Sequence, residues 1–152
     1  MSVVISSPTE SQIADASFAD RCQAALLAGI AAGTMTPVYG ELRHTFTPGI
    51  NGTHLYTREC TMPPGSRIVS MIHRTCHPYV VSRGIVAVKD QEGLEIIQAP
   101  HQGITLPGTQ RVLLVQEETV WTTFHIIPDT ITDPDEAIAW LTIPINNPLL
   151  EP

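Results

Sequence analysis

Turn-forming residues divide the chain at short intervals from about residue 36 to residue 128, and this feature constrains the fold more than any other. Runs rich in β-branched and apolar side chains alternate with Pro, Gly and Asn-Gly turns about 8 to 12 residues apart, a spacing typical of antiparallel β proteins. Threonine occurs 17 times and proline 13 times, whereas lysine occurs once. This composition favours short strands joined by tight turns over a helix bundle.

The runs between these turns define the predicted strands. They lack the helical period and contain many Val, Ile, Thr and aromatic residues. We therefore predict an antiparallel sandwich or small barrel. The strands are expected at Glu41–Thr47, His54–Met62, Arg67–Arg74, Tyr79–Ser82, Gly84–Lys89, Leu94–Gln98, Arg111–Gln116 and Thr119–Ile127.

Helical signals occur only near the two ends. Ser7–Glu10 combines a cap residue, a proline and an early acid, and apolar residues then recur at helical spacing to about Gly33, which predicts an N-terminal helix. Asp133–Glu136 predicts a short second helix through Trp140. The tail after it is apolar, so it is expected to lie on the barrel or on a neighbouring subunit. The predicted organisation is a helical arm (1–35), a β-barrel (36–128) and a C-terminal tail (129–152).

Charge and cysteine content exclude several classes of protein. The net charge is -7 and the arginines are scattered singly, so no basic surface is available for nucleic acid. The longest nearly apolar run, Ala24–Gly33, is too short to span a membrane, and the first residues lack the pattern of a secretory signal. The 3 cysteines form no CxxC pair, which favours reduced thiols over disulfides or a zinc ribbon. We therefore expect a cytoplasmic protein.

One stretch resembles the first motif of the cupin superfamily, in which two glycines enclose two histidines and a glutamate. The matching places are taken in turn by Gly65, Met71, His73, His77 and Gly84. All the spacings agree, but Met71 stands where cupins have the first histidine and His77 stands where they have the glutamate. The second cupin motif resembles Pro107–Gly108, with Arg111 in place of its metal-binding histidine.

The resemblance covers about residues 54 to 127 and implies a mainly β fold. That fold is a cupin-type, jelly-roll antiparallel β-barrel, here with an N-terminal helix and an apolar C-terminal tail. The chain is also similar to small cupin-like proteins of unassigned role encoded by tailed bacteriophages. This second likeness rests on Ala99–Pro100, Pro107–Thr109, Arg111–Val112 and Glu118–His125.

The cupin comparison implies a site inside the barrel. His73 and His77 would both enter the lumen and form half of a metal site, which needs a third protein ligand. His125 is the leading candidate for that ligand; Glu59 and Glu118 are alternatives, and Met71 would suit only copper. Buried histidines are also common as hydrogen-bonded core residues without any metal.

Arg111 introduces a second interpretation of the same lumen. A guanidinium aimed inward would repel a divalent ion, and together with His73 and His77 it would suit an anion such as a carboxylate or phosphate. The alternative is that Arg111 lies at a strand edge with its charged head in solvent.

Two functions follow from these features, and the sequence favours the non-catalytic one. In it, the chain is a structural or assembly protein without a cofactor, a virion or tail-associated component that forms a homo-oligomer through its terminal segments and contacts other virion proteins. In the other, it is a small cupin enzyme, an oxygenase, isomerase or epimerase acting on a small organic acid. That enzyme would use one iron, manganese or zinc ion held by His73, His77 and His125. Neither function involves nucleic acid or a membrane.

Overall fold

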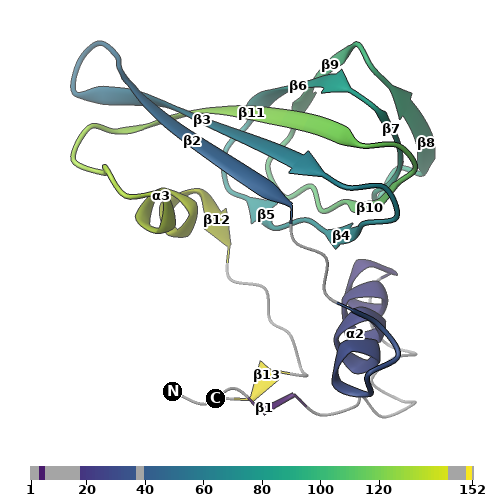
Figure 1. Ribbon diagram of the computed structural model, residues 1–152. Coiled ribbons are helices and arrows are strands. Elements are labelled where there is room, and N and C mark those ends of the chain that lie inside the picture. Colours follow the sequence, from purple (N-terminus) through teal and green to yellow (C-terminus); the bar gives the residue numbers. More distant parts are fainter. Residues whose placement is uncertain (1–3, 6–17, 37–39, 144–149, 152) are drawn as a thin grey trace.

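The computed structural model describes residues 4–5, 18–36, 40–143 and 150–151, and these are mainly antiparallel strands (Figure 1). Two helices are described, α2 (Phe18–Ala31) and α3 (Pro134–Leu141). The strands are β1 (Val4–Ile5), β2 (Glu41–Pro48), β3 (Thr53–Met62), β4 (Arg67–Val69), β5 (Ile72–His73), β6 (His77–Arg83), β7 (Ile85–Lys89), β8 (Leu94–Gln98), β9 (His101–Thr105), β10 (Val112–Val115), β11 (Thr119–Pro128), β12 (Thr142–Ile143) and β13 (Leu150–Glu151).

Most of these strands belong to two sheets. The larger has the order β2-β3-β11-β6-β9, and the smaller has the order β4-β10-β7-β8. Two further pairs, β12 with β5 and β1 with β13, complete the described strands. The long strands β3 and β11 pair along their full length, from Thr119 opposite Met62 to Pro128 opposite Thr53.

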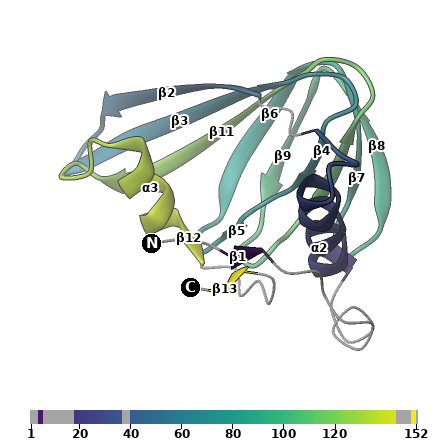
Figure 2. The same ribbon diagram turned by 60° about the horizontal axis from the view of Figure 1, so that its bottom comes forward.

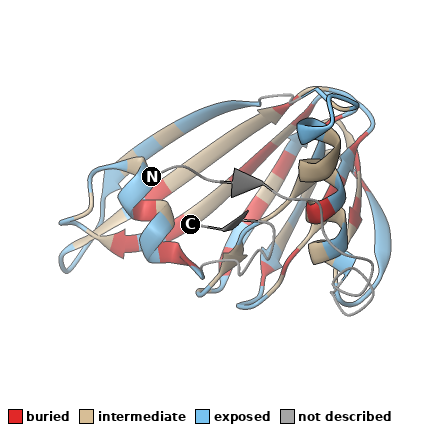
Figure 3. Ribbon diagram, turned by 90° about the horizontal axis from the view of Figure 1, so that it is seen from below, coloured by how far each residue is buried: buried red, intermediate tan, exposed pale blue. Residues whose placement is uncertain are grey.

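The main hydrophobic core lies between the two sheets. Side chains alternate between the two faces of a strand, and in β6 and β7 every second residue is buried. Figure 3 shows the buried residues as separate bands along the strands, between less buried ones. The core comprises Met62, Tyr79, Val81, Val86, Val88, Ile97, Leu113, Val115 and Trp121.

A second, smaller core lies where α3 packs under the long ends of β3 and β11 (Figures 1 and 2). Tyr56 and Ile127 from the strands meet Ala137 and Leu141 from the helix, all four almost completely buried. The carboxylate of Asp133 caps α3 by accepting hydrogen bonds from the backbone N–H groups of residues 135 and 136. The predicted short helix is therefore confirmed, and it lies on the strands of its own chain.

The N-terminal helix and the Asn51-Gly52 turn were also predicted. α2 ends at Ala31, close to the expected end, whereas the predicted start at Ser7–Glu10 lies outside the described residues. Asn51 and Gly52 both have positive φ angles, 53° and 72°, which is the backbone that a tight hairpin between β2 and β3 requires. In the described parts of the chain, no helix is long and apolar enough to cross a membrane.

Two strand predictions were wrong in detail. Residues 67 to 74 form two short strands, because Ser70 leaves the sheet: its N–H donates to the Arg111 carbonyl and its hydroxyl accepts from the Arg111 N–H. Strand β9 was missed because its inward positions are His101, Gly103 and Thr105, which carry no apolar periodicity. Gly103 is needed there, since a Cβ would lie 2.6 Å from the Tyr79 hydroxyl oxygen.

Candidate metal and anion site

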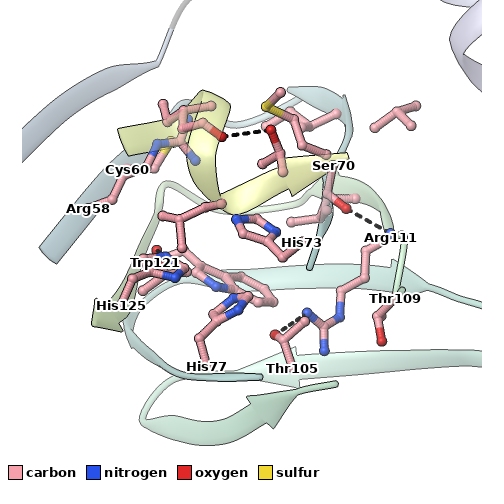
Figure 4. Close-up of a pocket in the computed structure, with 18 of the residues that line it drawn as sticks. Arg58, Cys60, Ser70, His73, His77, Thr105, Thr109, Arg111, Trp121 and His125 are labelled. Carbon is pink, nitrogen blue, oxygen red and sulfur yellow. Dashed lines mark hydrogen bonds between the residues drawn. The ribbon is translucent and has the colours of Figure 1, made fainter. Parts of the chain in front are cut away.

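A cavity of about 190 Å³ lies between the two cores, at one end of the sandwich (Figure 4). Its floor and walls come from the inward faces of β3, β6 and β11, and from the segment that joins β4 to β5. Ile138, Leu141 and Thr142, from α3 and β12, line the side nearest the C-terminal segment. The cavity therefore depends on both main sheets and on the segment that follows them.

Three histidines from three different strands meet in this cavity. His77 begins β6, His125 lies on β11, and His73 ends the short strand β5. The ring centroids are 4.5 Å apart for His73 and His77, 4.4 Å for His77 and His125, and 5.3 Å for His73 and His125. One nitrogen of each ring lies within 4.8 Å of the corresponding nitrogens of the other two. The structure thus brings together the three residues predicted as a metal-ligand set.

The local sequence explains why each ring points inward. In β11, Trp121, His125 and Ile127 are buried by the two-residue alternation of a strand. His77 and Tyr79 share the inward face of β6 in the same way. His73 instead depends on a distant segment, because its strand β5 pairs with β12 and places Thr142 opposite it.

The hydrogen bonds of the three rings fit a metal site. His77 donates from Nδ1 to the Thr75 carbonyl at 3.3 Å, His73 has a backbone hydrogen bond at Met71, and His125 Nε2 lies 2.8 Å from the Thr123 hydroxyl. His125 Nδ1 is buried and has no partner among the described residues. Metal-binding histidines commonly use one nitrogen for the ion and the other for such a protein partner.

The distances between the three histidine nitrogens limit how closely the cluster matches a bound metal ion. A tetrahedral ion with bonds of about 2.1 Å needs its nitrogen ligands about 3.4 Å apart. The three nitrogens here lie within 4.8 Å of one another, so pairs of them would have to approach by up to about 1.4 Å to bind one such ion.

The three imidazoles are held in the neutral form that binds metals. Burial, with the charges of the neighbouring histidines and Arg58, lowers the pKa of His125 to about 3. Burial also lowers the pKa of His73 to about 4, with further contributions from His77 and Arg58. The pKa of His77 is lowered by burial as well. At neutral pH all three rings therefore have a lone pair available for a ligand.

Two arginines flank the histidines, of which only Arg111 was predicted. The Arg111 guanidinium lies at the cavity wall, where it donates to the Thr105 hydroxyl at 2.7 Å and lies 5.1 Å from the Tyr79 ring centroid. Arg58, on the inward face of β3, lines the opposite side of the cavity (Figure 4). The signal that would have found it is the alternation Tyr56, Arg58, Cys60, Met62, which places a charge on an otherwise buried face.

The other predicted ligands lie elsewhere. Glu59 forms an ion pair with Arg43 at 3.1 Å, and Glu118 pairs with Arg83 at 2.8 Å, both away from the cavity lining. Met71 lines the cavity but is 40% exposed. Among the described residues that line the cavity, none is acidic. The site is therefore a cluster of neutral histidines between two positive charges.

Comparison with solved structures shows the fold. A structure of oxalate decarboxylase matches with a TM-score of 0.50 and 10% identity, covering 65% of this chain and 28% of that one. A cupin-2 domain containing protein from Shewanella frigidimarina matches with a TM-score of 0.43 and 12% identity over 65% of this chain and 90% of that one. KdgF from Halomonas sp. gives a TM-score of 0.43 and 13% identity over 59% and 94% of the two chains.

The predicted fold class is confirmed: the chain has a mainly antiparallel β, cupin-type fold with an N-terminal helix. At these identities the likeness concerns the fold alone. No family model and no curated protein sequence matches the chain.

Proposed function

We propose that this chain is a metal-dependent cupin-like protein in which His73, His77 and His125 hold one divalent ion and a small organic acid binds beside it. The observation that carries the proposal is the meeting of three neutral imidazoles, two buried and one half-buried, with ligand nitrogens within 4.8 Å of one another. The unpartnered His125 Nδ1 supports it, because a buried polar atom without a hydrogen bond is costly unless a ligand uses it.

The ligand set indicates which ions fit. Three imidazoles suit zinc or iron(II) better than manganese, which prefers oxygen ligands. Three protein ligands also leave a coordination position for a substrate, as catalytic zinc sites do. When bound, such an ion would polarise an oxygen of the organic acid.

The side chains around the three histidines determine which kind of substrate the site could bind. Arg111 is positioned to bind a carboxylate, and the ring of Trp121 and the side chain of Leu141 add apolar surface to the same cavity. This arrangement supports the chemistry of an oxygenase, isomerase or epimerase on a small acid, the classes that the cupin resemblance implied.

Metal content tests the proposal directly. Protein purified without chelator and then incubated with zinc or iron(II) is expected to hold about one ion per chain, because three nitrogen ligands converge on one point. The His125→Ala and His125→Gln variants are expected to lose nearly all of it, since two ligands remain. Elemental analysis after desalting gives the measurement, with circular dichroism to verify folding.

The matched control is His54→Ala, which removes a histidine of β3 that lies outside the cavity and contacts the Ile131 carbonyl. This variant is expected to keep its full metal content. Wild-type protein without metal after incubation with zinc, iron(II) and manganese(II) would overturn the proposal.

A second candidate is the assembly role that the phage resemblance implied, as a component of a virion or tail. The observation that favours it is β8, an edge strand of the smaller sheet whose outward residues Leu94 and Ile96 are 69% and 58% exposed. An apolar edge strand can pair with the same strand of a second copy. α3 packs on its own sheet, so β8 is the better candidate surface for self-association.

The mass of the protein in solution, measured by light scattering, tests the assembly role. Wild-type protein is expected to have the mass of a dimer or larger oligomer, and Ile96→Lys is expected to shift it to a monomer because a charged lysine on an edge strand opposes pairing with another chain. Ile126→Lys is the matched control, since Ile126 is 69% exposed on β11, a central strand of the other sheet. A wild-type protein that is monomeric at all concentrations would contradict the assembly role.

A further inference from the structure

The charge of the cavity presents a problem for the metal that the three histidines would bind. Arg58 and Arg111 both line the cavity, and no described lining residue is acidic. With neutral imidazoles the two guanidinium groups already give the cavity a formal charge of about +2, and a divalent ion would raise it to about +4. Metal sites in proteins normally offset such charge with carboxylates or bound anions.

Arg111 is fixed in place yet has unused hydrogen-bonding capacity. Its guanidinium is held by the Thr105 hydroxyl at 2.7 Å and lies against the rings of Tyr79 and Trp121, at 5.1 Å and 5.8 Å from their centroids. A guanidinium has five N–H donors, and among the described residues Thr105 is the one side chain that accepts a hydrogen bond from it. The remaining donors are available to a bidentate carboxylate.

Arg58 is the second positive group, and it approaches the histidines from β3. Its charge lowers the pKa of both His73 and His125, which places it close to the cluster. The Nε atom of Arg58 is buried without a hydrogen-bond partner in the part of the chain that the structure describes. In Figure 4 the histidines lie between Arg58 and Arg111. The buried Arg58 Nε, which has no partner among the described residues, and the spare donors of Arg111 on the other side of the set favour an anionic ligand.

The size of the cavity limits that ligand. A volume of about 190 Å³ equals about six water molecules at about 30 Å³ each. This space suits an acid of three or four carbons. A small dicarboxylate carries two negative charges, which equal the charge that a divalent ion adds.

We infer that the cavity binds its metal ion and a small dicarboxylate together, with Arg58 and Arg111 flanking the acid, so that each ligand tightens the binding of the other. The inference rests on the proposed metal site and names the substrate class of that site. The metal and dicarboxylate together leave the formal charge of the cavity where it was in the empty protein. Because coupling between two ligands is reciprocal, the same factor applies to both affinities.

The test measures zinc affinity with and without malonate, with the free zinc concentration set by a metal buffer so that complexes in solution are not counted. Malonate is expected to tighten zinc binding by at least tenfold, acetate by less, and neutral malonamide not at all. Calorimetry of malonate binding to the zinc-loaded and zinc-free protein is expected to give the same factor.

Two length-matched variants locate the effect. Arg111→Met and Arg58→Met are each expected to reduce the malonate effect to less than threefold, while zinc binding without malonate becomes equal or tighter because one positive charge is gone. Arg83→Met is the control, since Arg83 pairs with Glu118 at the surface, and it is expected to behave as wild type.

The possible failures are distinguishable. Stoichiometric zinc binding that malonate leaves unchanged would overturn the coupling and leave the proposed metal site intact. Zinc binding in neither condition would overturn both. Coupling that survives in both Arg111→Met and Arg58→Met would overturn the assignment of the dicarboxylate to these arginines.

Discussion

Lowering the pH from about 7.5 to about 5 is expected to destabilise the metal-free protein by about 4 kcal/mol through His73 and His125. Burial lowers the pKa of these residues to about 4 and about 3 in the folded state, whereas the unfolded chain has the ordinary value of 6.5. Above pH 6.5 both histidines are neutral in the folded and in the unfolded chain, so the free energy of unfolding is not reduced by their protonation. As the pH falls below that value, the two histidines bind protons in the unfolded chain but not in the folded chain. The free energy of unfolding therefore decreases until the pH reaches the pKa of the folded state.

Each histidine contributes about 2 kcal/mol at pH about 5, since one pKa unit corresponds to about 1.4 kcal/mol. The groups that face the two rings reinforce this direction. Arg58 from β3 adds positive charge beside both, Arg111 adds it beside His73, and His77 adds more if it is protonated.

Urea denaturation in the presence of chelator, at several pH values, gives the measurement. The His125→Gln variant removes one of the two titrating groups and is expected to lose about half of the pH dependence. A pH dependence that is the same in the variant and the wild type would show that the ring is not held neutral by burial.

Gly84→Ala is expected to destabilise the protein by about 3 kcal/mol or more, which corresponds to a fall in Tm of about 6 to 12 °C. Gly84 lies between β6 and β7, where the chain passes from one main sheet to the other, and it has a φ of +95°. A Cβ at this position would lie 2.5 Å from Thr119 Oγ1 and 2.7 Å from Thr119 Cα, and closer still to the Glu118 carbonyl oxygen. Thr119, the first residue of β11, is fully buried, so its backbone cannot shift without disturbing its neighbours.

Gly65→Ala is the matched control. Gly65 has a similar φ of +82°, but a Cβ there would meet nothing within 4 Å. This variant is expected to show the backbone strain alone, about 1 kcal/mol. Thermal unfolding of both variants separates the destabilisation by backbone strain from the destabilisation by the steric clash. Equal decreases in Tm would contradict the role assigned to the close approach at Gly84.

The spacing of Gly65, His73, His77 and Gly84 was sufficient to predict the fold class and two residues of the candidate site. His125 could be added because its predicted strand, Thr119–Ile127, follows the second cupin-like motif. These features are local or belong to a fixed pattern of turns, so they can be recognised in one sequence.

The features that were not predicted depend on contacts between segments that are distant in the sequence. Arg58 entered the site because β3 pairs with β11 and turns its alternate residues toward the histidines. The break of the predicted strand at Ser70 comes from hydrogen bonds to Arg111, which precedes the neighbouring strand β10 and is distant only in sequence. β9 carries no apolar period because it packs a glycine against Tyr79. None of these pairings has a signature within a short window of sequence.

The pairing of β5 with β12 also decides when the site can form. His73 lies opposite Thr142, so the strand that carries the first histidine gains its partner only after both sheets and α3 have been made. During synthesis β6 and β11 can pair and bring His77 and His125 together before β12 has been made. His73 can be positioned only after β12 is available to pair with β5. Contacts between such distant residues form late because closing the long loop between them is entropically costly. The cluster of His73, His77 and His125 is therefore incomplete until β12 has been made and has paired with β5.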